Sequence, residues 1–589
     1  MRRPIRRLPA VALLGLLAAT APASAATRPA VEAEHGMVVS ANALASAVGA
    51  EILRAGGNAV DAAVAVGYAL AVVDPCCGNI GGGGFLTLRL ADGTARFVDF
   101  RETAPAASVR DMYLDAAGRP NTDASLTGWR ASGVPGTVAG LDLALARWGS
   151  KPRAEVMAPA IRLARDGFVL ARPDTDILAR GTARLAADPE AARLFLAPGG
   201  GTRAPGDRLI QSDLAATLEA IAAGGAEAFY RGPIAAKVAA AMRAHGGTLT
   251  EDDFAAYRAV ERDPIRCSYR GHRLITAPPP SSGGVTLCLI LGVLEGWDMT
   301  AAGWHSAAAV HRTVEAMRHA FYLRNTLLGD PDFVTVPVER LLAPAHLAAL
   351  RARIERDGVL PSAALPAMPS TLEKPETTHY SVVDASGSAV AVTFTVNGAF
   401  GAAVVAPGTG FLLNDEMDDF TVKPGTPNLF GLVQGEANAI QPAKRPLSSM
   451  TPTIVEKDGR LEMVLGSPGG SRIVSIVAET LTNVIDHGMR PQDAVDAPRF
   501  HHQWLPDEIA HEPFALSPDT VALLKAMGYR LVEQTPWGAA ELVQTGPAEA
   551  KSADPASSGN DSAASGRLLP GRLYGASDDR RPAGAAVGN

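Results

Sequence analysis

Residues 377–384, which read Thr-Thr-His-Tyr-Ser-Val-Val-Asp, constrain the fold of this chain more than any other segment. They follow a loop-like run rich in proline, serine and charge at 360–376, and from Thr378 the residues alternate as in a β-strand. A protein that cleaves its own backbone would expose a new N-terminus at such a boundary. A threonine there holds nucleophile and base together, because its Oγ attacks while its own α-amine takes the proton. Taken alone, the segment fits a structural interpretation better, since most Thr-Thr pairs at strand starts are structural.

The surrounding pattern predicts helices packed outside antiparallel sheets. Residues 389–396 form a second predicted strand, and Asp384-Ala385-Ser386-Gly387 between the two runs is typical of a hairpin turn. Further strands are predicted at 85–90, 451–455 and 461–465, and helices at 40–55, 59–73, 473–487 and across most of 135–260 and 285–328. Helices early in the chain and strands around a central hairpin indicate an α+β fold in layers.

Composition places the chain among large globular proteins. It has 589 residues, of which 47% are apolar and 20% charged. This length is compatible with two to four domains or with one large, elaborated domain. The formal net charge of −7, with both signs mixed, argues against a nucleic-acid binder. Residues 548–566, rich in Ser, Ala, Gly and Asp, predict a disordered surface loop.

Residues 1–25 have the pattern of a signal peptide. Arginines stand at positions 2, 3, 6 and 7, an apolar run covers 8–20, and Ala23-Ser24-Ala25 forms a small-residue cleavage site. We therefore expect a mature chain that begins at Ala26 and is exported, most simply to a bacterial periplasm by the general route, with twin-arginine export left open. No later stretch reaches about 18 uncharged apolar residues, so no membrane span is predicted.

The four cysteines are too few for a disulfide framework in a chain of this length. Cys76 and Cys77 are adjacent, which makes one bridge between them awkward, whereas Cys267 and Cys288 could pair. We expect these cysteines to be reduced or without a functional role. No Cys/His cluster has metal-ligand spacing, and the sequence predicts neither a metal nor a cofactor.

Further motifs follow one another in a fixed order along the chain. They stand at 57–63, 80–85, 100–105, 278–284 and 328–333, and then at 377–384, 414–420, 444–450 and 466–472. Together they resemble the γ-glutamyltranspeptidase family from about residue 33 to the C-terminus. This family consists of N-terminal-nucleophile hydrolases that process themselves into a large and a small subunit.

The resemblance implies a four-layer αββα sandwich and a self-cleaved precursor. The bond between Glu376 and Thr377 would be broken by the Thr377 Oγ, leaving a large subunit of 26–376 and a small catalytic subunit of 377–589. Thr377 would then be an N-terminal nucleophile. A free α-amine has a reference pKa of about 7.7–8.0 and is a suitable base near neutral pH.

Three further residues are implied in the chemistry of acyl transfer. Thr395 lies on the partner strand of the predicted hairpin, and by resemblance it hydrogen-bonds the nucleophile; an ordinary cross-strand Thr pair is the alternative. Gly469 and Gly470 lie in a turn between a strand and a helix. Their N–H groups suit an oxyanion hole, in which one donor is typically worth about 10²–10³ in rate. A simple strand–helix turn is the alternative.

A γ-glutamyl donor carries an α-carboxylate and an α-ammonium, so its site needs groups of both signs. By resemblance, Arg101 is the bidentate clamp of the carboxylate. The implied neutral donors to that carboxylate are Ser448 and Ser449. The implied partners of the ammonium are Asp419 and Glu416, assisted by Asn397. Strand alternation would place Asn397 on the same face as Thr395. Asp418 is expected to face solvent or to be structural.

Residues 421–439 resemble the lid loop that some family members carry over the pocket. Phe430 stands where an aromatic residue, often tyrosine, forms the tip of the lid. Because phenylalanine lacks the hydroxyl, we expect looser closure. The alternative is that Phe430 packs in an ordinary turn.

The activity implied is transfer of the γ-glutamyl group from glutathione or related amides to water, amino acids or dipeptides by a heterodimer of the two subunits. A cephalosporin acylase of the same fold is one alternative. Glutaryl groups lack the α-ammonium, so the presence of Asp419, Glu416 and Asn397 weighs against it. An unprocessed binding scaffold is the other alternative, and the intact Thr377 and Arg101 weigh against that.

Overall fold

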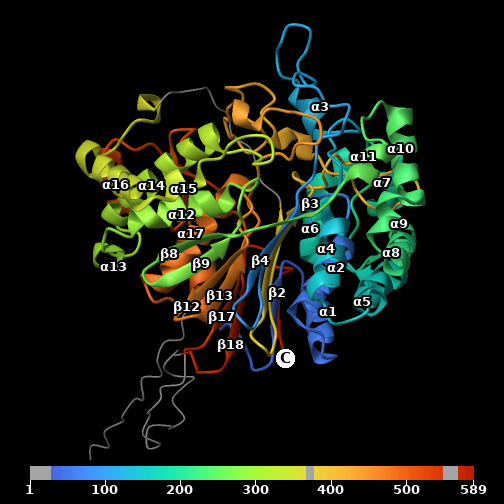
Figure 1. Ribbon diagram of the computed structural model, residues 1–589, viewed down its shortest axis with the longest axis horizontal. Helices are drawn as coiled ribbons and strands as arrows, with labels where there is room; N and C mark the ends of the chain where they lie inside the picture. The colour runs from blue at the N-terminus through green and yellow to red at the C-terminus, as the bar shows by residue number, and fades with distance from the viewer. Residues whose placement is uncertain (1–27, 366–376, 548–567) are drawn as a thin grey trace, which may run out of the picture.

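The computed structural model describes residues 28–365, 377–547 and 568–589 (Figure 1). The predicted signal peptide, Glu376 and the predicted loop at 548–566 lie outside the described residues. Two seven-stranded sheets stack face to face in the described part, and helices cover both outer faces. This arrangement confirms the predicted αββα sandwich. Among the described residues, no helix combines the length and the apolar character that a membrane crossing requires.

We call the two large sheets the β10 sheet and the β13 sheet; all neighbouring strands in both are antiparallel. In spatial order, the β10 sheet contains β19 (Ala585–Gly588), β2 (Met37–Ser40), β10 (Thr378–Val383), β11 (Ala389–Thr395), β3 (Gly83–Arg89), β4 (Ala95–Phe100) and β7 (Val260–Arg262). The β13 sheet contains β1 (Val31–Ala33), β18 (Leu573–Ser577), β17 (Glu541–Thr545), β13 (Arg460–Gly466), β12 (Thr453–Lys457), β9 (His272–Thr276) and β8 (Ile265–Tyr269). A small three-stranded sheet contains β14 (Phe500–His501), β15 (Ile509–His511) and β16 (Leu531–Glu533). A two-stranded sheet contains β5 (Phe168–Val169) and β6 (Arg208–Leu209).

One group of helices lies on the side of the β10 sheet (Figure 1). It consists of α1 (Ala43–Arg54), α2 (Ala59–Val73), α3 (Thr122–Leu126), α4 (Thr137–Trp148), α5 (Arg153–Asp166), α6 (Arg172–Leu185), α7 (Pro189–Phe195), α8 (Ser212–Gly224), α9 (Ala226–Tyr230), α10 (Pro233–His245) and α11 (Glu251–Ala256). The other group consists of α12 (Gly283–Leu294), α13 (Met299–Ala302), α14 (Ala307–Leu327), α15 (Val338–Leu342), α16 (Pro344–Asp357), α17 (Ile473–Ile485), α18 (Pro491–Asp496) and α19 (Pro518–Ala526). Single 3₁₀ turns are η1 (Ser362–Ala364), η2 (Glu416–Asp419), η3 (Glu436–Asn438) and η4 (Gly470–Arg472).

Helix α2 shows how the sequence builds the layer behind the β10 sheet. Asn58 caps it by accepting from the N–H groups of Val60 and Asp61, and the Asp61 carboxylate accepts in return from the Asn58 N–H at 2.8 Å. Every residue of the helix is buried, as its small and apolar composition predicts. A separate apolar cluster fills the space between the two sheets and includes Met37, Ile275 and Val464.

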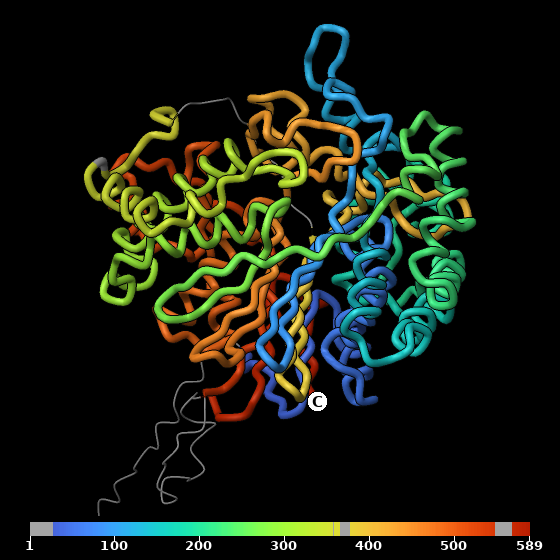
Figure 2. The backbone as a smooth tube through the Cα atoms, in the orientation of Figure 1, coloured from blue at the N-terminus to red at the C-terminus, as the bar shows by residue number. Residues whose placement is uncertain are grey.

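The segments before and after residue 376 share both large sheets. In the β10 sheet, β10 and β11 pair with each other between β2 and β3, and Figure 2 shows this yellow hairpin beside blue strands. In the β13 sheet, β12 pairs with β9 and β18 pairs with β1. A cut at this point therefore leaves two pieces held together by strand pairing and a common core.

The cysteine expectation is wrong with respect to oxidation state. Cys76 and Cys77 form a disulfide, as do Cys267 on β8 and Cys288 on α12. The packing of α12 against β8 brings the Cα atoms of the second pair to 6.0 Å, well within the ordinary range for a disulfide. The first pair closes within the turn that follows α2, and only the three-dimensional course of that turn reveals it.

Candidate active site

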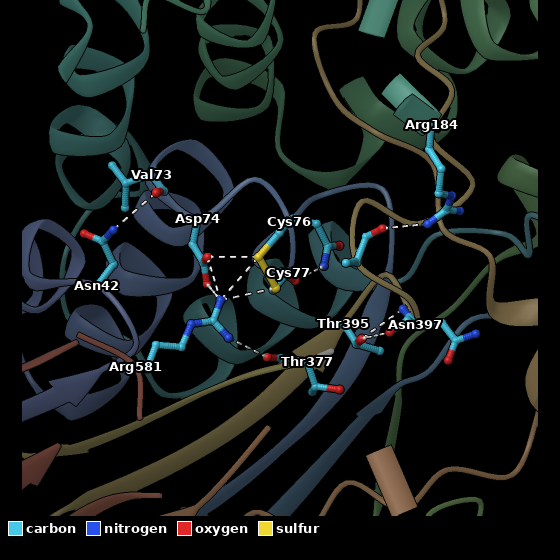
Figure 3. Close-up of a disulfide and its surroundings, with 12 residues drawn as sticks. Asn42, Val73, Asp74, Cys76, Cys77, Arg184, Thr377, Thr395, Asn397 and Arg581 are labelled. Atoms are coloured by element: carbon cyan, nitrogen blue, oxygen red, sulfur yellow. Dashed lines mark hydrogen bonds and ion pairs between the residues drawn. A yellow bond between two sulfur atoms is a disulfide. The ribbon is translucent and has the colours of Figure 1, made fainter. Parts of the chain in front are cut away.

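The β10–β11 hairpin brings the two predicted threonines together. Thr378 pairs with Phe394, so Thr377, one residue earlier, stands opposite Thr395 at the end of the hairpin. Both are buried and line a single cavity of about 290 Å³; Figure 3 labels the two residues near each other. The hairpin itself therefore fixes the nucleophile candidate beside the second hydroxyl.

Asn397 reaches the same cavity by a different route from the predicted one. Strand β11 ends at Thr395, and Asn397 has a φ of +77°, so strand alternation does not govern its side chain. Its backbone N–H donates to Thr395 Oγ1 at 2.9 Å, and its Nδ2 donates to the carbonyl of Asp415 at 3.0 Å. The prediction of a shared strand face is wrong, whereas the cavity does contain Asn397.

The cavity gathers residues from both predicted subunits. Its lining consists of Arg101, Arg324, Thr377, Thr395, Asn397, Glu416, Asp419, Phe430, Leu432, Ser448, Ser449, Met450, Gly470 and Ile473. Among the predicted site residues that the structure describes, Gly469 alone is absent from this lining, and it directly precedes Gly470. The sequence motifs, scattered over more than 350 positions, therefore converge on one place.

The acidic side of the cavity is formed by Arg101 and three carboxyl groups. Arg101, just after β4, forms ion pairs with Glu416 through Nη1 and with Asp419 through Nη2, and Glu102 Oε2 lies 3.5 Å from Nη1. The 3₁₀ turn η2 begins at Glu416 and ends at Asp419, so one turn carries both residues. Backbone contacts orient the guanidinium, since Arg101 Nε donates to the carbonyl of Pro446 at 3.2 Å.

Burial governs the electrostatics of this acidic side. It raises the pKa of Glu102 to about 7 and also raises the pKa values of Glu416 and Asp419, although the charge of Arg101 opposes each shift. One cation thus faces three buried carboxyl groups. The cluster can retain a proton near neutral pH and presents a surplus of anionic oxygen to a cationic ligand.

Arg324 on α14 is a second cation of the cavity, which the sequence motifs missed. It donates to Ser449 Oγ at 3.2 Å, to Ser282 Oγ at 3.0 Å and to Gln434 Oε1 at 2.8 Å. Among the described residues, its hydrogen-bond partners are all neutral, and burial lowers the pKa of Arg324 to about 10. No local signal marks it, because it lies within a long helix ahead of the motif at 328–333.

The proline-rich motif at 278–284 serves as the support of the serine pair. Ser282 donates to the Ser448 carbonyl through its N–H at 2.7 Å and its Oγ at 2.6 Å. The Ser448 N–H in turn donates to the Pro280 carbonyl at 3.0 Å. Ser448 and Ser449 are thereby held at the cavity by a segment of the other predicted subunit.

The glycine turn between β13 and α17 supplies backbone donors. Gly469 and Gly470 have φ values of +143° and +55°, a conformation that favours glycine. Gly469 caps the 3₁₀ turn η4 and Gly470 begins it, and α17 follows, so their N–H groups lie at the start of a helical segment, where unpaired donors attract negative charge. Gly470 reaches the cavity, as an oxyanion donor must.

The predicted lid loop lies over the acidic side. Asn428 Nδ2 donates to Asp419 Oδ1 at 3.0 Å, and Gln503 Nε2 donates to the Phe430 carbonyl at 3.1 Å. The Leu429 N–H donates to Asp418 Oδ2 at 2.7 Å, so Asp418 is buried and structural rather than solvent-facing. These bonds fasten the loop without a hydroxyl on Phe430.

His379, close to Thr377 in sequence, is unsuited to be the base. Its ring is fully buried and contacts Thr393 Oγ1 at 2.8 Å and Ser381 Oγ at 3.1 Å. Burial lowers the pKa of His379 to about 3, and it does not line the cavity. The α-amine that cleavage would create at Thr377 remains the better candidate base.

Comparison with known proteins agrees with this arrangement. The family profile described as Gamma-glutamyltranspeptidase matches residues 45–587. A glutathione hydrolase proenzyme of Pseudomonas sp. (strain A14) is 50% identical over 96% of this chain and 96% of its own length. The glutathione hydrolase proenzyme of Escherichia coli (strain K12) is 46% identical over 93% of this chain and 91% of its own. The crystal structure of a cephalosporin acylase from Bacillus halodurans superposes with a TM-score of 0.80 at 25% identity, covering 95% of this chain and 97% of that one.

Proposed function

Because the chain belongs to the γ-glutamyltranspeptidase family, we propose that it cleaves the γ-glutamyl amide bond of glutathione and related compounds. The group would pass through an ester on Thr377 to water, an amino acid or a dipeptide. One observation carries the proposal: a buried threonine at a strand start shares a cavity with cations, carboxylates and serine hydroxyls. These groups match a substrate that carries an α-carboxylate and an α-ammonium at the end away from its scissile amide.

The chemistry follows from the positions of the groups. Thr377 Oγ attacks the γ-carbonyl while its α-amine accepts the proton, and Thr395 supports the orientation of the nucleophile. The N–H groups of Gly469 and Gly470 stabilise the oxyanion. Departure of the amine leaves the acyl-enzyme, which water or an acceptor amine then resolves.

Donor recognition uses the two sides of the cavity. The α-ammonium is assigned to Asp419 and Glu416, with Asn397 assisting. The α-carboxylate is assigned to Arg101, Ser448 and Ser449, with Arg324 behind Ser449 as an additional cation. Charge-assisted hydrogen bonds of this kind are roughly twice as strong as neutral ones, so the head group would fix the amide at Thr377.

The active form would be a heterodimer produced by maturation. Cleavage between Glu376 and Thr377 would free the α-amine, and removal of residues 1–25 would accompany export to the periplasm. The interleaved strands support this proposal, because they keep both pieces in one fold after the cut. No cofactor takes part in the proposed reaction.

The test combines a gel with one assay. The purified protein should give two bands, and the smaller should begin Thr-Thr-His-Tyr, whereas Thr377→Ala should remain one chain without turnover. Glutathione turnover should be measured with and without glycylglycine to separate hydrolysis from transfer. A small band that begins elsewhere, or cutting that persists in Thr377→Ala, contradicts the assignment; one uncut, inactive parent chain would favour the scaffold alternative.

A glutaryl acylase is the second candidate. The similarity to a cephalosporin acylase structure favours it. The surplus of buried carboxyl groups opposite Arg101 disfavours it, because a glutaryl group has no ammonium to place there.

A further inference from the structure

The turn that follows α2 holds a second buried charged cluster, outside the donor cavity (Figure 3). Arg581 Nη2 donates to Asp74 Oδ1 at 2.8 Å and lies 3.3 Å from Cys76 Sγ and 3.2 Å from Cys77 Sγ. Asp74, Cys76 and Cys77 present possible metal-ligand atoms within 4.8 Å of one another. The guanidinium already contacts all three side chains, so the cation of this cluster is Arg581.

The same arginine reaches the nucleophile candidate. Its other terminal nitrogen, Nη1, donates to the carbonyl oxygen of Thr377 at 3.3 Å. Arg581 therefore links the disulfide turn to the backbone of the residue whose Oγ must be placed for attack. Among the described residues that line the donor cavity, Arg581 is absent, so its action on the reaction would pass through Thr377.

A second chain of contacts joins the disulfide turn to Thr395. The Cys77 carbonyl accepts from Asn79 Nδ2 at 3.0 Å, and Asn79 Oδ1 accepts from the Gly82 N–H at 2.6 Å. Gly82 packs so tightly that a Cβ there would lie 2.0 Å from the Thr395 carbonyl oxygen. A movement of the turn would therefore be passed to the hairpin through direct contacts.

We propose that Cys76–Cys77 is a thiol-sensitive redox site and that Arg581 is a positioning residue through which it sets the placement of Thr377. In the disulfide form, Arg581 is held by Asp74 and the two sulfurs and keeps its bond to Thr377. The inference rests on the proposed role of Thr377 as nucleophile.

Reduction by a dithiol changes the cluster in two ways. The Sγ–Sγ bond breaks, each cysteine gains a hydrogen, and the dithiol closes to its own disulfide, a two-electron exchange. Without the covalent bond the two sulfurs can separate, and because both cysteines are almost fully buried and both sulfurs contact Arg581 Nη2, their movement changes that contact. The new Cys76 S–H can also donate to Asp74 Oδ1, 3.3 Å away, and compete with Arg581 for it.

A small cavity lies beside this turn. It encloses about 270 Å³ and is lined by Asp74 and Pro75 on one side and by Leu170, Asp174 and Phe400 on the other. Neither cysteine lines this cavity and both are buried, so the reductant has to be small enough to reach a sulfur when the turn opens. Dithiothreitol is therefore the appropriate probe.

The experiment uses the processed enzyme in a Cys267→Ala/Cys288→Ala background, so that Cys76 and Cys77 are the only cysteines. Dithiothreitol should lower kcat for a γ-glutamyl anilide by about tenfold, less than the ~10²-fold that a 1 Å misplacement can cost. The donor KM should stay the same, and reoxidation should restore kcat. Adding Cys76→Ala/Cys77→Ala should abolish the response, and adding Arg581→Gln should lower kcat and leave it unresponsive.

The outcomes separate this inference from the proposed function. Alkylation and mass spectrometry of the untreated protein should show no free thiol at Cys76 or Cys77. Free thiols there, an unchanged kcat on verified reduction, or a response that survives in Arg581→Gln would each overturn the redox proposal. A parent that does not turn over the anilide, or a Thr377→Ala variant that does, would instead overturn the proposed function.

Discussion

The donor cavity contains two buried arginines in opposite surroundings. Arg101 meets three carboxyl groups on one side, whereas Arg324 on the other side donates to neutral oxygens. Arg101 thus has more than one carboxyl partner, whereas Arg324 has neutral hydrogen-bond partners among the described residues and feels an acidic charge only from Asp419, so each cation is poorly balanced alone. A bound zwitterion would supply what each side lacks: its ammonium would meet the surplus carboxyl groups, and its carboxylate, assigned to Arg101 and the two serines, would also bring a negative charge near Arg324. The different surroundings of Arg101 and Arg324 therefore match the two opposite charges of the donor, and substitutions on the two sides should affect donor binding differently.

The largest effect is expected from Asp419→Asn, which also separates the two enzyme candidates. Losing one partner of a desolvated charge pair costs roughly 2–5 kcal/mol, which is about 30-fold or more in kcat/KM for a γ-glutamyl anilide. A glutaryl anilide has no ammonium, so it should be a poor substrate of the parent and lose little, or even improve, in Asp419→Asn. The measurement is steady-state kinetics of both substrates on both proteins.

The exposed Asp252 provides the matched control, since Asp252→Asn removes the same charge at a residue that does not line the donor cavity. Its kinetics should equal those of the parent. A parent that prefers the glutaryl compound would replace the γ-glutamyltranspeptidase activity by the acylase activity.

Glu102→Gln should remove one pH-dependent contribution to the stability of the folded protein. The pKa of Glu102 in the folded protein is about 7, above its ordinary value near 4.5, so the folded state binds the extra proton between these pH values. The stabilisation is complete below about pH 4.5 and is lost as pH rises through about 7, a change on the order of 3 kcal/mol. Glutamine does not ionise, so the Tm of the variant relative to the parent should rise from pH 5 to pH 8.

The exposed Glu533 on β16 serves as the control for this series. Glu533→Gln should follow the parent at every pH. A Glu102→Gln curve parallel to that of the parent would show that Glu102 is already ionised throughout this range in the folded state.

Arg101→Lys keeps the positive charge at this position but replaces the two-pronged guanidinium by a single ammonium group. Glu416 and Asp419 are bound by different nitrogens of Arg101, and a single ammonium cannot reproduce both contacts. We expect the donor KM to rise by about 30-fold, or about 2 kcal/mol, with autoprocessing intact. Arg243→Lys, at an exposed position, is the control. An unchanged donor KM in a processed Arg101→Lys protein would place the carboxylate clamp elsewhere.

The sequence predicted the acidic side of the cavity, around Arg101, much better than the side around Arg324. The hairpin, α2 and the motif residues of the acidic side were predictable because local alternation, capping and a shared family pattern act on contiguous residues. Arg324 was not, because its role arises from the placement of α14 against a distant serine loop. Asn397 was predicted with the wrong reason, since a positive φ replaced strand alternation. The Cys76–Cys77 bridge depends on the course of its turn, and the contact of Cys77 with Arg581 joins residues 504 positions apart, for which no local rule exists.

The smallest effect is expected from Arg324→Gln, on the neutral side. Glutamine retains one donor toward Ser449 but removes the charge, so the donor KM should rise by about fivefold, or about 1 kcal/mol, with kcat preserved. Burial of Arg324 outweighs its attraction to Asp419 and lowers its pKa, so removing this charge should leave the Tm unchanged or raise it, whereas Arg101→Lys should lower the Tm by leaving two carboxylates poorly paired.

Arg312→Gln on the same helix makes this last test specific, because Arg312 contacts Trp297 and the Asp298 carbonyl rather than the cavity. It should change neither the donor KM nor the response to donor analogues that lack the α-carboxylate. Such decarboxylated donors should bind equally to Arg324→Gln and to the parent, because they lack the carboxylate that the charge of Arg324 would attract. If Arg324→Gln weakens both kinds of donor alike, Arg324 supports the serine loop and the carboxylate is held by Arg101 and the serines without it.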